Sequence, residues 1–212
     1  LETIAEENGW TDLYLVSPEG KIVYSISQNE ELFKNILLDE EFNDTNLKQA
    51  YLDAQASNPD EILIADFEPY SFSNGLETAF KIAQVRNKQN IMFGFLVIQF
   101  PLNDINEIIQ NKTGLSEHSD SYLAGEVDGT TVYRSDRPAV DKEVGDFVKG
   151  MDVTRGISGQ SGYIYKFGLS GYYEIALYDP IDFYGLDWMI STNVPMGEVI
   201  NPTIAGETED YY

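Results

Sequence analysis

The sequence predicts an α+β protein of two tandem modules, each a roughly five-stranded antiparallel sheet with flanking helices, preceded by one helix. Three observations predict this class. At 212 residues the chain is long enough for two domains of about 100 residues each. Hydrophobic residues form 42% of it and aromatic residues 13%, which is enough to build two cores. An internal duplication gives both halves the same order of elements.

The duplication begins with a β-hairpin in each half. Two strand-like runs flank a Ser-Pro-Glu-Gly turn in the first half, and two similar runs flank a longer turn in the second. The four runs are residues 12–16, 21–25, 120–124 and 130–135. Asp12 matches Asp120 and Tyr14 matches Tyr122. Each hairpin is followed by a helical or irregular segment and by three further strands, so each half predicts one complete sheet.

The remaining elements follow from local patterns. Residues 1–9 favour a helix that ends at Gly9. Leu102 to Lys112 is expected to be a connecting helix, because its apolar residues recur at helical spacing. The other expected elements are a helix at 46–56, a helical or irregular stretch at 141–150, and strands at 61–67, 78–85, 91–100, 162–167, 172–178 and 186–194. These elements divide the chain into a first module at 1–104, a second module at 105–200 and a tail at 201–212.

One segment of the first half has no counterpart in the second. Asp66 to Gly75 joins two predicted strands and combines turn-forming Pro, Ser, Asn and Gly with several aromatic rings and hydroxyls. Rings supply contact area and hydroxyls supply orientation, which suits the wall or lid of a small-molecule pocket. The alternative is a hairpin whose aromatic residues cap a core. The residues alone leave both interpretations open.

The composition excludes several classes of function. A formal net charge of −23 and a pI near 4.1 exclude a nucleic-acid binder, which needs a basic face. The absence of cysteine excludes disulfides and thiolate chemistry. Neither a phosphate-binding glycine motif nor a calcium-loop spacing occurs, so no cofactor or metal is expected. No apolar run reaches the roughly 20 residues of a membrane helix. Because the chain opens on Leu1, we expect an excised fragment whose flanking membrane helices have been removed.

The sequence also argues against an enzyme. His118 is the only histidine and lies in the polar segment SEHSD, with no nucleophile elbow nearby. Carboxylates are so abundant that pairing any two of them as acid and base carries no information. We therefore expect no catalytic residues.

Four motifs in order resemble one branch of the double Cache (dCache) domains. Asp66 to Phe80 (DFEPYSFSNGLETAF) is similar to a pattern like DFxPYxPSxGxPAAF. Gly94 to Asn106 is similar to GVLALQLPLDxIN, and Gly114 to Asp136 is similar to GLGETGETYLVGxDGxxRSDS. Gly185 to Trp188 matches GLDW, so the resemblance spans residues 10 to about 200. Such domains are the extracytoplasmic sensors of bacterial chemoreceptors, sensor kinases and cyclases, and their modules are PAS-like.

The resemblance implies a small-molecule sensing domain of a transmembrane signalling receptor in the inner membrane, facing the periplasm or the outside. The ligand, of unknown identity, is expected in the first, membrane-distal module, and the second module is expected to relay the change. The expected ligand-binding residues are Asp66, Tyr70, Ser73, Asn74, Phe80, Phe95 and Gln99. Two alternatives stay open: a dimerisation or interaction module that uses the aromatic face of residues 163–178, and, less favoured, an enzyme on a PAS-like scaffold.

The chain also departs from the dCache pattern. Phe72 and Glu77 replace two prolines of the loop, and Gln99 stands where amine-reading members have an aspartate. An amide supplies no countercharge, which argues against a free amino acid as the ligand. Asp66 fits equally well as a pocket acid or as a loop cap. In the second module Trp188 is expected in the core. Two further expectations are that Arg134 and Asp136 brace the structure, and that Tyr212 of the tail packs against the first helix.

Overall fold

The computed structural model describes residues 2–127, 129–183 and 185–200. The chain divides into two compact units, the first ending at Ile105 and the second beginning at Asn106. Each unit contains one five-stranded sheet, and all the strand pairs described below are antiparallel. The predicted α+β class with two tandem modules is therefore confirmed. The tail from residue 201 onward, with the proposed packing of Tyr212, lies outside the described residues.

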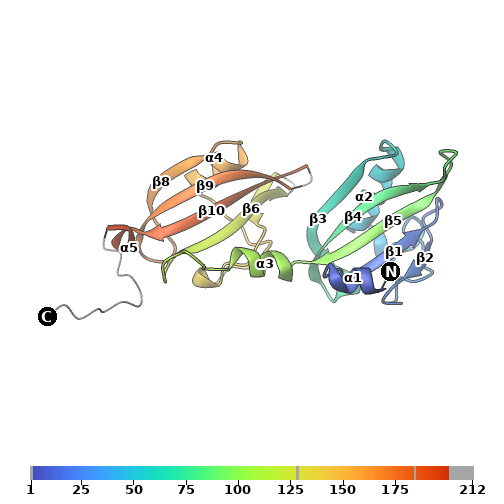
Figure 1. Ribbon diagram of the computed structural model, residues 1–212, viewed down its shortest axis with the longest axis horizontal. Coiled ribbons are helices and arrows are strands. Elements are labelled where there is room, and N and C mark those ends of the chain that lie inside the picture. The colour runs from blue at the N-terminus through green and yellow to red at the C-terminus, as the bar shows by residue number, and fades with distance from the viewer. Residues whose placement is uncertain (1, 128, 184, 201–212) are drawn as a thin grey trace. The chain divides into compact units, whose positions relative to one another are not determined.

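The first module has the strand order β2-β1-β5-β4-β3 (Figure 1). Helix α2 packs on β3 and β4, and its N-cap is Thr45, whose side chain accepts a hydrogen bond from the backbone N–H of Lys48. The elements are α1 (Glu2–Glu7), β1 (Asp12–Val16), β2 (Ile22–Ser25), the 3₁₀ turn η1 (Glu40–Phe42), α2 (Asn46–Ala56), β3 (Ile62–Tyr70), the 3₁₀ turn η2 (Ser71–Ser73), β4 (Leu76–Arg86) and β5 (Met92–Pro101).

The second module repeats this order as β7-β6-β10-β9-β8. Its elements are α3 (Asn103–Ile109), β6 (Asp120–Val127), β7 (Thr130–Tyr133), the 3₁₀ turn η3 (Pro138–Val140), α4 (Met151–Ile157), β8 (Gly162–Phe167), β9 (Tyr173–Phe183), β10 (Leu186–Pro195) and α5 (Met196–Ile200). The registers match as well: Asp12 pairs with Gln99 in the first sheet, and Asp120 pairs with Asn193 in the second. The duplication seen in the sequence is thus a duplication of backbone pairing.

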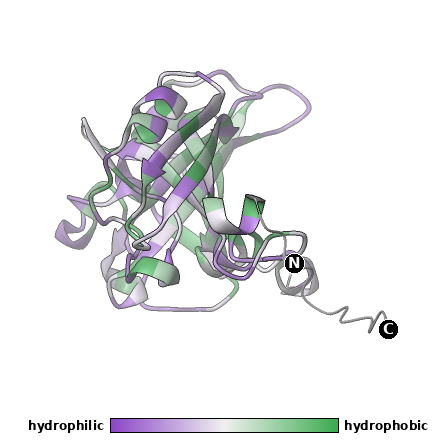
Figure 2. Ribbon diagram, turned by 90° about the vertical axis from the view of Figure 1, so that its left-hand side faces the viewer, coloured by the Kyte–Doolittle hydropathy of each residue, from purple (hydrophilic) through white to green (hydrophobic). Residues whose placement is uncertain are grey.

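Each module has its own hydrophobic core. The first core gathers buried side chains of the sheet with those of α2, including Tyr51 and Phe95. The second is smaller and centres on Tyr122, Tyr133 and Met189. Figure 2 shows hydrophobic and hydrophilic residues mixed along the same strands, as expected where one strand face meets the core and the other meets solvent. Trp188 is buried and stacks on Phe183, so its predicted core role is confirmed.

The aromatic loop is shorter than the sequence predicted. We expected a loop from Asp66 to Gly75, whereas β3 continues to Tyr70 and pairs with β4 up to the 3₁₀ turn. Two features explain the longer strand. A bulge between Ala65 and Glu68 absorbs a shift of register. Pro69 lies on an edge strand, where its missing N–H leaves no ladder bond unmade.

A second difference concerns the helix of the second module. The stretch 141–150, expected as helical or irregular, is irregular, and the short helix α4 follows it. Seven residues with a glycine among them gave no clear helical signal. Gly156 is there because α4 packs closely on β10, where an added Cβ would lie 2.7 Å from Met189. Tertiary contact, not local propensity, therefore supports this helix.

Candidate functional site

A cluster of buried polar side chains lies inside the first module. Tyr14 and Tyr70 are fully buried, and Glu31 and Gln99 are 2% and 3% exposed. The Tyr14 hydroxyl lies 2.6 Å from Gln99 Oε1 and 3.0 Å from Glu31 Oε1. Buried polar groups in proteins normally have a hydrogen-bond partner, so an atom of this cluster without one is unusual.

Two neighbouring strands and one loop bring three of these side chains together. Tyr14 comes from β1 and Gln99 from the adjacent β5, whose alternate residues Phe95, Val97 and Gln99 are all buried. The period of two predicted for this strand is therefore confirmed. Glu31 comes from the segment between β2 and η1.

The hydrogen bonds of Glu31 and Tyr70 are incomplete. Tyr14 has one hydroxyl proton but faces two acceptor oxygens, so it cannot satisfy both. Glu31 Oε2 and the Tyr70 hydroxyl are buried and make no hydrogen bond of ordinary length and angle with the described residues, although the two groups lie close enough for Glu31 to raise the pKa of Tyr70. Burial raises the pKa of Glu31 above its ordinary value. A proton on Glu31 would supply the donor that the cluster lacks.

The phenol groups respond to the same environment. Burial, followed by the charge of Glu31, raises the pKa of both Tyr14 and Tyr70 above the ordinary value. Both phenols therefore stay protonated at neutral pH. The cluster in this state is a set of neutral donors and acceptors around one carboxyl group.

The η2 turn covers this cluster. Ser73 Oγ accepts a hydrogen bond of 2.8 Å from Gln99 Nε2. The Phe72 ring lies 5.5 Å from the Tyr70 ring and 5.0 Å from the Phe42 ring, and the ammonium of Lys34 lies 4.7 Å from the Phe72 centroid. The turn is thus fixed to the cluster by one hydrogen bond and by ring packing.

The other side of the turn borders an open hollow of about 720 Å³. Its lining residues are Gln28, Asn29, Glu30, Glu41, Ser71, Phe72 and Asn74. The hollow is polar and acidic, and Glu30 is the chain neighbour of the buried Glu31. Ser71, Phe72 and Asn74 of the turn thus line this open hollow, while Ser73 of the same turn bonds to the buried polar cluster.

The structure places the seven predicted residues in three groups. Tyr70, Ser73 and Gln99 lie in the cluster, and Phe80 packs edge-on against Tyr70 with ring centroids 4.9 Å apart. Asn74 is exposed and lines the hollow.

The last two predicted residues lie elsewhere. Phe95 packs edge-on against Tyr51 of α2, in the main core. Asp66 lies at the β3 bulge, where its carboxylate accepts from the Phe67 N–H and its carbonyl accepts from the Asn46 amide. Both bonds join Asp66 to the bulge and to α2, away from the cluster around Glu31.

Sequence reasoning missed Tyr14 and Glu31. Tyr14 carried a signal, because the duplication repeats it as Tyr122. Glu31 carried none, since it follows Glu30 in an acidic segment and nothing local distinguishes the two. Glu31 also changes the argument drawn from Gln99. The missing countercharge at position 99 weighed against an amine ligand, yet Glu31 brings a carboxyl group to the same cluster.

Other chemistry finds little support in the part of the chain that the structure describes. Those residues contain no group of three or more acidic or histidine side chains arranged to hold a metal ion. His118 pairs with Glu198 at 2.5 Å and is half exposed. None of the described helices is long and apolar enough to cross a membrane.

Comparison with known proteins gives no relative by sequence. No family model matches the chain, and no curated protein matches it. Solved structures do match. The extracellular domain of a putative histidine kinase, rpHK1S-Z16, superposes with a TM-score of 0.64 at 13% identity, over 95% of this chain and 77% of that one. The ligand-binding domain of a Pseudomonas fluorescens chemoreceptor, solved with L-leucine, gives 0.58 at 13% identity, over 93% and 75%.

An extracellular ligand-binding receptor from Desulfohalobium retbaense gives a TM-score of 0.63 at 15% identity and covers 92% of this chain. This chain spans only 32% of that receptor. The chain has the fold of an extracellular sensor domain. The resemblance seen in the sequence is therefore confirmed at the level of the fold, and these neighbours are the extracellular or ligand-binding parts of receptors and of a putative histidine kinase.

Proposed function

We propose that the chain is the extracytoplasmic sensing domain of a bacterial transmembrane signalling receptor, and that it binds a small molecule in the first module without transforming it. The observation that carries the proposal is the pair of unmet polar atoms, Glu31 Oε2 and the Tyr70 hydroxyl, beneath a five-residue turn. The sensor-domain fold of the neighbours supports the same assignment and a position facing the periplasm or the outside.

The unmet atoms favour a ligand with a protonated amine. Glu31 is an acceptor when ionised, and the Tyr70 hydroxyl and Gln99 amide oxygen add neutral acceptors. A charged hydrogen bond to a buried carboxylate is among the strongest polar contacts in proteins. The ammonium would replace the proton that burial favours on Glu31.

The turn supplies the conformational change. A ligand that enters from the hollow must displace the bond between Gln99 and Ser73 and the contact of Phe72 with Tyr70. The turn therefore has two packings, one closed on the empty cluster and one closed on the ligand, and the ligand shifts the balance between them. We assign the relay of this change to the second module.

A thermal-shift experiment tests the proposal. The probes are L-amino acids and small primary amines, each paired with the carboxylic acid that lacks the amine. At about 100 times its Kd, a ligand that binds only the folded state stabilises it by roughly 2.7 kcal/mol. We expect amines to raise the Tm, Glu31→Gln and Tyr70→Ala to abolish the rise, and Asp60→Asn to leave it intact. Asp60 is exposed and controls for the loss of one negative charge.

Two outcomes would reject this function. The first is an equal rise of Tm with the amine-free acids, which would show that the amine of the ligand does not bind the carboxyl group of Glu31. The second is a Glu31→Gln variant that responds to amines as the unmodified protein does.

One observation keeps the interaction module as a second candidate. Three aromatic residues of β8, Tyr163, Tyr165 and Phe167, are 61%, 65% and 63% exposed. They are alternate residues of an edge strand, so their side chains point to the same face of the sheet. If this face joins two copies, Tyr165→Ser will lower the mass measured by light scattering from dimer to monomer. A monomer before substitution removes this candidate.

A further inference from the structure

The second module contains a hollow of about 360 Å³ beside the start of α4. Its wall includes Tyr122, Tyr133, Ile164, Leu169, Asp152 and Lys166. Small-molecule pockets in proteins measure roughly 300–1,000 Å³ and combine apolar walls with a few polar groups. The size and the lining of this hollow match that description.

Asp152 supplies an unmet acceptor at this hollow. Its side chain is fully buried, and its Oδ2 accepts from Lys166 Nζ at 2.5 Å, from the Tyr122 hydroxyl at 3.1 Å and from Ser191 Oγ at 3.3 Å. All three bonds converge on one oxygen. The other oxygen, Oδ1, is buried without a partner among the described residues. A fully buried carboxylate oxygen without a donor is rare in proteins, and a ligand that carries a donor would satisfy it.

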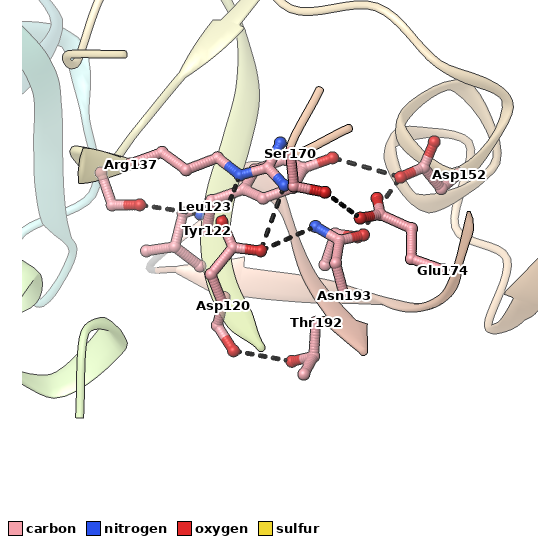
Figure 3. A network of polar contacts seen from close by, with 12 residues as sticks. Asp120, Tyr122, Leu123, Arg137, Asp152, Ser170, Glu174, Thr192 and Asn193 are labelled. Atoms are coloured by element: carbon pink, nitrogen blue, oxygen red, sulfur yellow. Dashed lines mark hydrogen bonds and ion pairs between the residues drawn. The ribbon is translucent and has the colours of Figure 1, made fainter. Parts of the chain in front are cut away.

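Glu174 supplies a second unmet acceptor near the first. In Figure 3 the carboxylates of Asp152 and Glu174 lie together at one end of the polar network. Glu174 is 2% exposed, and its Oε2 accepts from Ser170 Oγ at 3.0 Å. Its Oε1 has no hydrogen bond and lies 3.7 Å from Lys166 Nζ. One ammonium thus stands between two buried carboxylates.

The charges around the hollow leave one negative charge unbalanced. Asp120 and Arg137 form their own ion pair at 2.6 Å. Lys166 offsets one of the two acids, Asp152 and Glu174. Lys149 also lines the hollow but is exposed, so solvent screens its charge. An organic cation is the ligand that would balance this arrangement.

Asp152 is ready to bind a cation at neutral pH. Burial works to raise the pKa of Asp152, but the hydrogen bond and charge of Lys166 outweigh it and hold the pKa below its ordinary value. Two glycines, Gly150 and Gly168, allow the backbone to lie directly against the two carboxylates, because a side chain at either position would collide with them. A Cβ added at Gly150 would lie 2.4 Å from Asp152 Oδ1, and one added at Gly168 would lie 2.2 Å from the Glu174 carboxylate.

We propose that this hollow is a second ligand site, which binds a small monoamine with an apolar body through Asp152. The aromatic and aliphatic wall takes the apolar body, the unmet Oδ1 of Asp152 takes the ammonium, and Glu174, which lies behind Lys166 and outside the wall, adds a second negative charge. The site is built entirely from the second module and does not depend on the cluster around Glu31.

The test uses the Glu31→Gln protein, so that binding in the first module does not interfere. The ¹⁵N-labelled protein is titrated with phenethylamine and, in parallel, with 2-phenylethanol, which has the same apolar body and no charge. Shifts of backbone amides in β6, α4 and β8 report the second module. A charge-assisted hydrogen bond is worth at least about tenfold in Kd, so we expect the amine to bind at least about tenfold tighter than the alcohol.

Two variants test the two parts of the site. Asp152→Asn removes the charge and is expected to cancel the preference for the amine. Because it also changes a buried network, Leu169→Trp serves as a second variant: Leu169 lines the hollow but is 68% exposed, so a larger ring fills the hollow without touching the carboxylates. We expect Leu169→Trp to weaken phenethylamine by about tenfold and Leu169→Ala to weaken it less.

Three results would overturn the proposal. These are equal affinity for the amine and the alcohol, amide shifts that fall outside the second module, and a Leu169→Trp protein that binds phenethylamine unchanged.

Discussion

Each of the two modules buries a carboxyl group next to a tyrosine, but the two carboxyl groups have different surroundings. In each, a tyrosine on the first strand of the hairpin lies within hydrogen-bond distance of a buried carboxyl group: Tyr14 of Glu31 in the first module, and Tyr122 of Asp152 in the second. The second carboxylate has Lys166 beside it, and its pKa lies below the ordinary value because this lysine outweighs the effect of burial. Burial instead raises the pKa of Glu31. The same scaffold thus raises the pKa of one buried carboxyl group, that of Glu31, and lowers the pKa of the other, that of Asp152.

The difference comes from which segment supplies each partner. The aspartates Asp12 and Asp120 occupy the same register, yet Asp12 accepts from hydroxyls and backbone N–H groups, including Ser25 at 2.7 Å and the Ile26 N–H at 2.9 Å, whereas Asp120 pairs with Arg137. The first module buries neutral polar groups and the second buries ion pairs. Removing one partner of a buried ion pair leaves a charge that is costly to bury, whereas a hydrogen-bonded cluster around one carboxyl group can exchange a proton.

The largest expected effect tests the ion pairs of the second module. Lys166→Met leaves Asp152 and Glu174 buried without their shared cation, and removing one partner of a buried pair costs about 3–5 kcal/mol. Urea unfolding, followed through amide signals of the second module, measures the loss. The matched control is Lys34→Met, because Lys34 pairs with Glu41, which is more than half exposed. That control is expected to cost less than about 1 kcal/mol, and equal losses would remove the contrast between the modules.

A smaller effect tests the opposite protonation of the two carboxyl groups. The pKa of Glu31 is raised in the folded protein, so its contribution to stability is complete below the ordinary carboxyl pKa and is lost as pH rises through the folded pKa. Glu31→Gln mimics the protonated form. It is expected to stabilise the protein by about 1–2 kcal/mol near pH 8 and to change little near pH 4.

Asp152 is expected to behave in the opposite sense. Its pKa is lowered when folded, so its contribution is present above the ordinary carboxyl pKa and is lost as pH falls through the folded pKa. Asp152→Asn is therefore expected to destabilise the protein near pH 8. Thermal unfolding of both variants between pH 4 and pH 8 measures the direction in which each substitution changes the stability. If both substitutions change stability in the same direction at pH 8, the assigned protonation of one carboxyl group is wrong.

The sequence predicted the scaffold better than it predicted the cluster, for a physical reason. Strand alternation is a local property, so the sheets and the inward position of Gln99 followed from the period of two. Tyr70 and Ser73 were found because they lie in one short aromatic segment. Glu31 was missed because Glu30 has the same local sequence environment, and only packing against β1 and β5 buries one of the two.

The second module shows the same limit. Asp152 and Lys166 lie 2.5 Å apart, on α4 and β8, and neither residue stands in a motif. The prediction that Arg134 and Asp136 brace the structure fits the backbone around them: Asp136 accepts from the Asn106 amide at 2.6 Å and from the Val144 N–H at 3.0 Å, and Arg134 is 2% exposed. Side chains that come together only through tertiary packing have no fixed spacing in the sequence, so no sequence motif predicts their contact.

The smallest expected effect on stability separates a binding atom from a structural one. The Tyr122 hydroxyl donates to buried Asp152, so Tyr122→Phe leaves that carboxylate with one donor fewer and is expected to cost about 1–1.5 kcal/mol. The Tyr70 hydroxyl is buried without a hydrogen bond, so Tyr70→Phe removes a desolvated group that gains nothing in the empty state. Its effect on unfolding is expected to stay within about 0.5 kcal/mol and to favour stability.

Binding should reverse that order. If Tyr70 contacts the ligand of the first module, Tyr70→Phe will weaken binding of an amine by about tenfold while the Tm of the empty protein stays level or rises, because the lost hydrogen bond exists only in the complex. Tyr122→Phe is expected to leave binding in the first module unchanged while it lowers the Tm. Titration calorimetry and thermal unfolding of the two variants separate these outcomes. A Tyr70→Phe protein that loses stability but binds as before would make Tyr70 a structural residue and leave Glu31 alone to carry the proposed site in the first module.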